Sequence, residues 1–316
     1  MSVEELWRAR VEGRFGLKHY VKAWIISTRA FALPWAVGYA LFGALLAGVS
    51  DWSAALGACI TVSLVLLAGH FINNYRDVER GVDPIVSDPE EARKIISSIK
   101  PYTAAAWIVP LQITSIRFQK ASAVAMLLLS MLAYCLLVPK TLYTLVFYVI
   151  GVFMAISYTD FWKPKRIGEA AAFIGHGFAT TAFGYLAQSP DILNAMLAGV
   201  VPGFISALAY SVDQYLDIKT DFVERVRSIA EAWFNSRLPL GLYVLAIVAF
   251  LYHLLTAWVA LGIYPKGVLL AYILLPFYLL TIARVEYDRE KGVRDAAVLT
   301  TIALPLIMCV GVLLGF

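Results

Sequence analysis

The chain has 316 residues, of which 60% are hydrophobic and only 15% are charged. Soluble globular domains carry about 25% charged residues, so this composition excludes an ordinary water-soluble protein and indicates a membrane protein. The net charge of +4 is small, and we expect no binding to nucleic acid.

Long apolar segments alternate with short charged ones along the whole chain. Each segment is close to the ~20 residues that a helix needs to cross the hydrocarbon core, and a helix satisfies its own backbone hydrogen bonds there. We therefore predict one all-α polytopic domain over residues 1–316, with nine transmembrane helices around a central cavity. The predicted spans cover residues 22–48, 52–74, 121–138, 141–158, 169–188, 194–214, 238–260, 268–285 and 295–315.

The segment before the first span, residues 1–21, is rich in charge. Trp7, Val11 and Phe15 recur every four residues in it, a spacing that places them on one face of a short helix lying on the membrane surface. A solvated terminus fits this pattern equally well. We expect no signal-peptide cleavage, because the apolar segment that follows is too long for a signal-peptide core.

Basic residues are distributed unevenly between the two sides of the predicted bundle. Of the 26 Lys and Arg residues, only Lys140 and Lys266 fall toward the side opposite the N-terminus. Basic residues near span ends are retained in the cytoplasm. We therefore predict a multi-pass protein of the cell membrane with a cytoplasmic N-terminus and an external C-terminus. The loops after spans two, four, six and eight are then cytoplasmic.

The inner end of the second span carries polar side chains that an apolar helix would not need. Asn73 and Asp77 lie four residues apart and so share one helix face. Gly81 can end the helix, so that Asp83 turns back toward them. Because an aspartate at membrane depth costs about 2.5 to 3.5 kcal/mol, such a cluster indicates a functional site.

A second acidic cluster ends the sixth span, where Asp213, Asp217 and Asp221 form one stripe at helical spacing. Stacked carboxylates repel one another unless cations or protons neutralise them. Mg²⁺ is a suitable cation, because it takes a few carboxylates and completes its shell with water and phosphate oxygens. If the bundle brings spans two and six together, the two clusters face one cavity and hold a diphosphate through Mg²⁺.

At these residues the sequence resembles the UbiA superfamily of intramembrane prenyltransferases, whose motifs are written NDxxDxxxD and DxxxD. Asn73 and Asp77 match the first motif. The second motif is matched by Asp213, Asp217 and Asp221. The continuation Gly81-Val82-Asp83 resembles the menaquinone-type branch, which prenylates 1,4-dihydroxy-2-naphthoate.

Two further segments carry the resemblance. Arg29 with Leu33-Pro34 is similar to the family's RPxTLP segment, and Tyr158-Thr159 before Gly168-Glu169 is similar to its YT…GE segment. The sequence also departs from the family: Asn74 replaces an Asp of the first motif, and Leu216 stands where the menaquinone branch often has Arg.

The resemblance implies Mg²⁺-dependent transfer of a polyprenyl group from its diphosphate to a lipophilic, aromatic acceptor. The expected partners are the polyprenyl diphosphate, the acceptor and the lipid bilayer. We expect no obligatory protein partner. The predicted metal ligands are Asn73, Asp77, Asp83, Asp213, Asp217 and Asp221. Asp77, Asp217, Lys163 and Tyr158 are assigned to catalysis. Residues assigned to binding the diphosphate or acceptor are Asn73, Asn74, Arg29, Lys165, Arg166 and Lys219.

Alternatives remain open at the level of the sequence. A cation-coupled transporter also places acids within the membrane, although its sites usually lie near midplane at broken helices. A protein that binds isoprenoid lipid without activity would keep the cavity but need not keep six ligands. Among prenyltransferases, the acceptor can also be a phenolic acid, a tetrapyrrole or the geranylgeranylglyceryl phosphate of ether-lipid synthesis. We assign no chemistry to the histidines.

Overall fold

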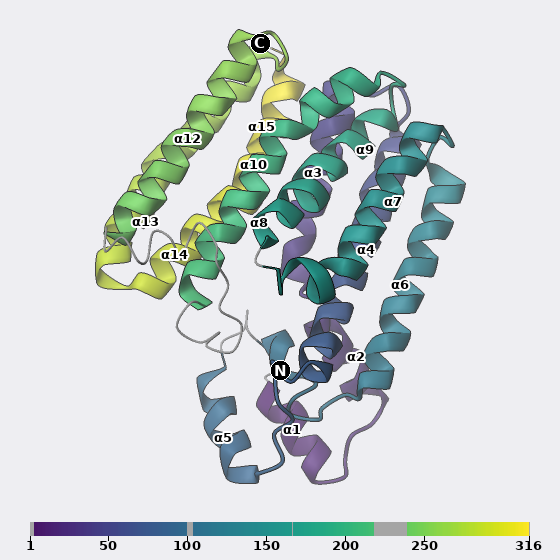
Figure 1. The fold of residues 1–316 in the computed structure, drawn as a ribbon, viewed down its shortest axis with the longest axis vertical. Helices are drawn as coiled ribbons and strands as arrows, with labels where there is room; N and C mark the ends of the chain where they lie inside the picture. The colour runs from purple at the N-terminus through teal and green to yellow at the C-terminus, as the bar shows by residue number, and fades with distance from the viewer. Residues whose placement is uncertain (1–2, 100–103, 166, 218–238, 316) are drawn as a thin grey trace.

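The fold is a bundle of helices, seen here in a computed structural model that describes residues 3–99, 104–165, 167–217 and 239–315. Within these ranges the chain contains helices and no strand, which confirms the all-α prediction. Figure 1 shows α6 and α7 on one flank, α12 and α13 on the other, and α3 and α10 between them. The described N- and C-terminal ends lie at opposite ends of the bundle.

The helices follow the apolar segments in chain order. The first half contains α1 (Val3–Val11), α2 (Leu17–Ser27), η1 (Ala30–Ala32), α3 (Leu33–Leu46), α4 (Trp52–Glu79), α5 (Pro89–Ser98), η2 (Ala104–Trp107), α6 (Ile116–Leu137), α7 (Leu142–Ser157) and η3 (Tyr158–Trp162). The second half contains α8 (Gly168–Ala171), η4 (Ala172–Ala179), α9 (Thr180–Leu186), α10 (Ile192–Asp217), α12 (Leu240–Ala260), η5 (Lys266–Leu274), α13 (Leu275–Tyr287), α14 (Arg289–Val298), η6 (Leu299–Ala303) and α15 (Leu304–Leu314).

Eight helical stretches of the described residues are long and apolar enough to cross a membrane. They correspond to eight of the nine predicted spans. The remaining one, the fifth predicted span at residues 169–188, falls on the successive helices α8, η4 and α9. These helices pack against α3, α7 and α10 inside the bundle. The multi-pass membrane class is therefore confirmed, and the count of nine is approximate.

The first predicted span, residues 22–48, is not one continuous helix. Helix α2 ends at Ser27, and Arg29 adopts the left-handed conformation with φ 49° before η1 and α3 begin. A non-glycine residue rarely takes this conformation unless its surroundings hold it there. Apolar length alone predicted the crossing but not this break.

Small residues let the central helices approach each other closely. A Cβ at Gly177 of η4 would overlap the backbone of Pro202 in α10, and one at Gly43 of α3 would overlap the backbone of Thr181 in α9. Membrane helices lack a hydrophobic drive to associate, so close backbone contact between small residues supplies much of their packing.

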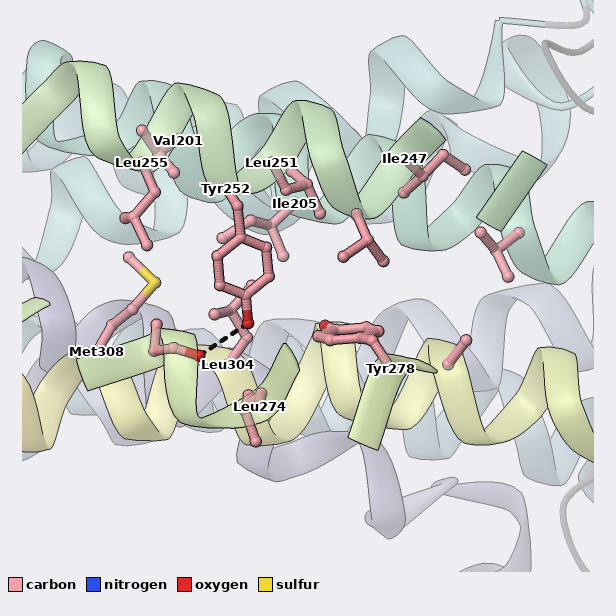
Figure 2. Close-up of a cluster of buried hydrophobic side chains, with 14 of the residues drawn as sticks. Val201, Ile205, Ile247, Leu251, Tyr252, Leu255, Leu274, Tyr278, Leu304 and Met308 are labelled. Carbon is pink, nitrogen blue, oxygen red and sulfur yellow. Dashed lines mark hydrogen bonds between the residues drawn. The ribbon is translucent and has the colours of Figure 1, made fainter. Parts of the chain in front are cut away.

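The C-terminal half has its own apolar core between α10, α12, α13 and α15. Figure 2 shows side chains of α10 and α12 facing those of α13 and α15 across this core. Tyr252 crosses the layer and donates a hydrogen bond of 2.7 Å to the carbonyl oxygen of Ala271. The buried tyrosine therefore brings no unsatisfied hydroxyl into the apolar interior.

The N-terminal segment packs on the loop that follows α4, at the end of the bundle where α5 lies (Figure 1). Helix α1 buries Val3 and Leu6, whereas Val11 is exposed. Trp7 and Phe15 are partly buried against the same cluster, so protein covers part of the predicted face, and its contact with the membrane surface stays a prediction. Because the partner is a protein surface, the buried face runs through Val3 and Leu6.

Candidate active site

The inner end of α4 is built as the sequence predicts. Gly81 adopts φ +72°, its N–H bonds to the carbonyl of Val78, and Val82 N–H bonds to the carbonyl of Asp77. This pair of bonds is a Schellman motif, in which a glycine in the left-handed region ends a helix. Asp83 N–H also bonds to the Asp77 carbonyl, at 3.1 Å, so the chain turns back toward the helix end.

Asp77 is buried at this helix end and contacts a lysine from another part of the chain. Its carboxylate lies 3.3 Å from Nζ of Lys163, and the two side chains are only 6% and 13% exposed. Lys163 directly follows η3, a π-helical turn at the end of α7. Two residues that the sequence assigns to catalysis, Asp77 and Lys163, therefore lie in contact although 86 positions separate them in the chain.

Asn73 and Asn74 point to different neighbours. Thr159 of η3 donates a hydrogen bond of 3.1 Å to Oδ1 of Asn73. Asn74 is fully enclosed; its Nδ2 donates to the Ser27 carbonyl at 3.1 Å, and its Oδ1 accepts from Arg29 at 3.3 Å. Asn73 therefore lies on the same face of α4 as Asp77. Asn74 instead links α4 by hydrogen bonds to the break in the first predicted span.

Tyr158 links this region to α10. Its hydroxyl donates a hydrogen bond of 2.8 Å to the hydroxyl of Tyr210, and the two rings meet edge to face. A Cβ at Gly168 would overlap the Tyr210 hydroxyl, so the close approach of α8 to this ring needs glycine. Tyr210 was missed by the sequence analysis, although it lies on α10 only three residues before Asp213.

The second acidic cluster lies partly outside the described residues. Asp213 and Asp217 occupy the last turns of α10, whose inner end is held beside η3 through Tyr210 and Tyr158. Their side chains are outside what the structure describes, as are Arg166, Lys219 and Asp221 altogether. Among the described side chains, no three acidic, histidine or cysteine groups gather as metal ligands. The six-ligand metal site and the central cavity therefore stay predictions.

Ion pairs lie beside the C-terminal end of α4. Arg76 contacts Asp160 and Glu79 at 3.1 Å, and Lys120 bonds to Glu79. Lys165 is exposed and its Nζ lies 3.7 Å from the centre of the Phe161 ring. Of the two described basic residues in the loop after α7, Lys163 and not Lys165 contacts the acidic helix end.

The buried amide network also includes Gln119, a residue outside every motif of the sequence. Gln119 is fully buried near the start of α6 and donates to Oγ of Ser27 at 3.0 Å and Oγ1 of Thr114 at 2.9 Å. A single glutamine beside charged residues gives no pattern in the sequence. These contacts connect α2, α4 and α6 around the break in the first span.

The fold and this site define a polytopic helical membrane protein with acidic, amide and basic side chains gathered at one end of its bundle. Two solved structures have the same fold over nearly the whole chain. A UbiA homologue from Aeropyrum pernix K1 shares 19% identity with a TM-score of 0.64, covering 89% of this chain and 97% of that one. A digeranylgeranylglyceryl phosphate synthase studied in membranes shares 17% identity with a TM-score of 0.58, covering 93% and 98%.

No protein-family model and no curated protein sequence matches the chain. The likeness therefore concerns the fold alone: the chain shares its helical architecture with these two proteins.

Proposed function

We propose that the protein transfers a polyprenyl group from polyprenyl diphosphate to a lipophilic acceptor, with Mg²⁺ as cofactor. The observation that carries this proposal is the buried contact between Asp77 and Lys163 at the inner end of α4. That helix end lies near the inner end of α10, which bears Asp213 and Asp217. Its fold, moreover, is that of UbiA-type proteins.

The residues present suit a magnesium ion. Carboxylate and amide oxygens are ligands that Mg²⁺ accepts, and Asp77 with Asn73 offers both on one helix face. In this proposal Asp83, Asp213, Asp217 and Asp221 complete the set. When bound, Mg²⁺ neutralises the charge that develops on the departing diphosphate.

The protein's own side chains have three tasks in the reaction. Lys163 supplies a positive charge near Asp77 that stabilises the diphosphate more strongly as the allylic C–O bond breaks. The rings of Tyr158 and Tyr210 offer aromatic faces toward an allylic cation. Burial of Asp77 and Asn74 beside apolar helices keeps water from quenching that cation.

Two acceptors are candidates for the transfer. The Gly81-Val82-Asp83 continuation favours a dihydroxynaphthoate-like quinone precursor. A second candidate is geranylgeranylglyceryl phosphate, favoured by the structural likeness to a digeranylgeranylglyceryl phosphate synthase. Both would use the same diphosphate machinery with a different acceptor pocket.

The proposal is tested by incubating the purified protein with labelled prenyl diphosphates of several lengths. The acceptors are 1,4-dihydroxy-2-naphthoate and geranylgeranylglyceryl phosphate, with Mg²⁺ or with EDTA. We expect prenylated product from one acceptor in Mg²⁺, its loss in EDTA, and a fall of about 100-fold or more in Asp77→Asn.

The matched control is Asp191→Asn, because Asp191 is exposed at the start of α10 and Asn also caps a helix. It should keep full turnover. Turnover that survives both EDTA and Asp77→Asn would contradict the metal-dependent mechanism, and no transfer to either acceptor would contradict both acceptor assignments.

A further inference from the structure

Helix α2 exposes a stripe of large apolar side chains. Leu17, Val21 and Ile25 recur every four residues in it and are 80%, 49% and 52% exposed. The other side of α2 is buried against the protein through Ala23 and Ser27. Residues at this spacing lie on one face of a helix, so the three exposed side chains form a continuous surface, which we call the α2 stripe.

Two lysines border the α2 stripe along a single edge. Lys18 and Lys22 each follow a stripe residue by one position, and a rotation of about 100° per residue places both on the same side of the stripe. Among the described residues neither lysine forms an ion pair, and α2 contains no acidic residue. The stripe therefore has a basic edge that is available to an anionic partner.

The basic edge distinguishes α2 from the lipid-facing side of an ordinary span. Helix α7 also exposes large apolar residues, among them Val149 and Phe153, but it contains no lysine or arginine. An apolar face bordered by lysines is typical of a helix that lies along a membrane surface, with its apolar side in the acyl region and its charges among the headgroups.

The first transmembrane crossing does not need α2. The apolar stretch from Leu17 to Leu46 holds 30 residues, whereas about 20 cross the hydrocarbon core. The chain breaks at Arg29, and η1 and α3 beyond the break hold 3 and 14 residues. Together they reach the lower end of the range that spans a bilayer, about 17 residues. Helix α2 can therefore lie outside the hydrocarbon core.

The contacts of α2 place it at the end of the bundle that carries the candidate active site (Figure 1). The Ser27 carbonyl, at its C-terminal end, accepts a hydrogen bond from Asn74 near the inner end of α4. The centre of the Tyr20 ring lies 5.6 Å from that of Phe118 in the first turn of α6. Because α4 and α6 are long enough to cross the membrane, their ends mark the boundary between acyl chains and headgroups. Helix α2 therefore lies at that boundary.

We infer that the α2 stripe and its lysine edge bind anionic phospholipids in the leaflet at this end of the bundle. The acyl chains contact Leu17, Val21 and Ile25, and the phosphate groups pair with Lys18 and Lys22. Lysine can do this because its methylene stem follows an apolar surface while its ammonium group reaches the headgroups. This inference goes beyond the proposed function, because it assigns a lipid partner to a helix outside the candidate active site.

The first test locates the α2 stripe relative to the bilayer. In a full-length variant without its three cysteines, a fluorescent label is attached to Val21→Cys, and the protein is reconstituted in vesicles. The vesicles contain phospholipids with a nitroxide quencher either near the headgroup or near the end of the acyl chain. We expect stronger quenching of the Val21→Cys label by the nitroxide near the headgroup.

Two labelled positions serve as controls for the first test. Leu129→Cys, exposed in the middle of α6, should be quenched more strongly by the nitroxide near the chain end. Ser97→Cys, exposed on α5, should be quenched by aqueous iodide and by neither lipid.

The second test measures lipid selectivity at the Val21→Cys label, by comparing nitroxide-labelled phosphatidylglycerol with nitroxide-labelled phosphatidylcholine. We expect a preference of about 5- to 25-fold for phosphatidylglycerol, from the attraction of two lysines to anionic lipid. Lys18→Gln combined with Lys22→Gln should abolish the preference, and the same pair changed to Arg should keep it. Lys140→Gln, at the other end of the bundle, should leave it unchanged.

Raising the salt concentration gives the same information without changing the lysines, which decides the matter if the Gln variant fails to fold. The preference for phosphatidylglycerol should then fall, because salt screens exposed charges.

Several outcomes overturn the inference. Quenching of the Val21→Cys label by iodide, as at Ser97→Cys, would place the α2 stripe in water, and a pattern like that of Leu129→Cys would place α2 within the span. A label that neither lipid nor iodide reaches would show that a second copy of the chain covers the stripe. A preference that survives both Gln substitutions, or high salt, would exclude the lysine edge. No readout depends on prenyl transfer, so the proposed function is tested separately.

Discussion

At the scale of single residues, Asn74 explains how this chain tolerates its departure from the UbiA motif. Asn74 is 2% exposed and donates to the Ser27 carbonyl while accepting from Arg29. A carboxylate can accept from Arg29 but has no proton to donate to a carbonyl. The amide therefore stabilises the break in the first span through both of its polar atoms.

Restoring the motif with Asn74→Asp should destabilise the protein for this reason. The Ser27 carbonyl would lose its side-chain donor and face a negative charge, which costs about 1 to 3 kcal/mol for a buried group. Thermal unfolding in detergent measures the loss. Equal stability of Asn74→Asp and the unmodified protein would argue against the assigned hydrogen bond.

At the scale of elements, the apolar length of each segment predicted where helices lie, and helical spacing predicted which polar residues share a face. The turn at Gly81 was also predictable, because glycine readily takes a positive φ. The break at Arg29 was not predictable from the local sequence, because Arg29 takes its left-handed conformation where it bonds to Asn74, 45 residues away. Partners such as Tyr210 and Gln119 depend on helix packing and leave no local pattern.

Close helix contact provides a prediction at this scale. Gly177→Ala places a methyl group against the Pro202 backbone, so η4 and α10 must separate, at a cost of about 1 to 3 kcal/mol. Gly151→Ala on α7 meets nothing within 4 Å and should be neutral or stabilise by up to about 1 kcal/mol through helix propensity. Melting temperatures of the two variants are compared. Equal effects would contradict the close approach of these helices.

At the scale of the whole molecule, composition alone predicted a helical membrane bundle. The structure adds that the basic loop after α7, the inner end of α4 and the inner end of α10 meet at one end. From the sequence, the two acidic clusters were predicted to share one cavity only if spans two and six come together. The structure supports it through Tyr158 and Tyr210, two side chains in the turn and helix next to those clusters.

We propose a cytoplasmic N-terminus and an external C-terminus from the distribution of basic residues. In a variant without its three cysteines, a thiol at Ser97 in α5 should be cytoplasmic, and one at Ser189 between α9 and α10 should be external. A membrane-impermeant maleimide applied to intact cells should label Ser189→Cys and spare Ser97→Cys until the membrane is opened. The reverse pattern would invert the proposed topology.

The central claim is that the end of the bundle around Asp77 and Lys163 holds a prenyl diphosphate through Mg²⁺. Equilibrium binding of a labelled, non-hydrolysable prenyl diphosphate analogue tests it without depending on the acceptor. We predict binding in Mg²⁺ that is lost in EDTA and weakened about 100-fold or more in Asp77→Asn, but unchanged in Asp191→Asn. Binding of equal strength in all four samples would contradict the account.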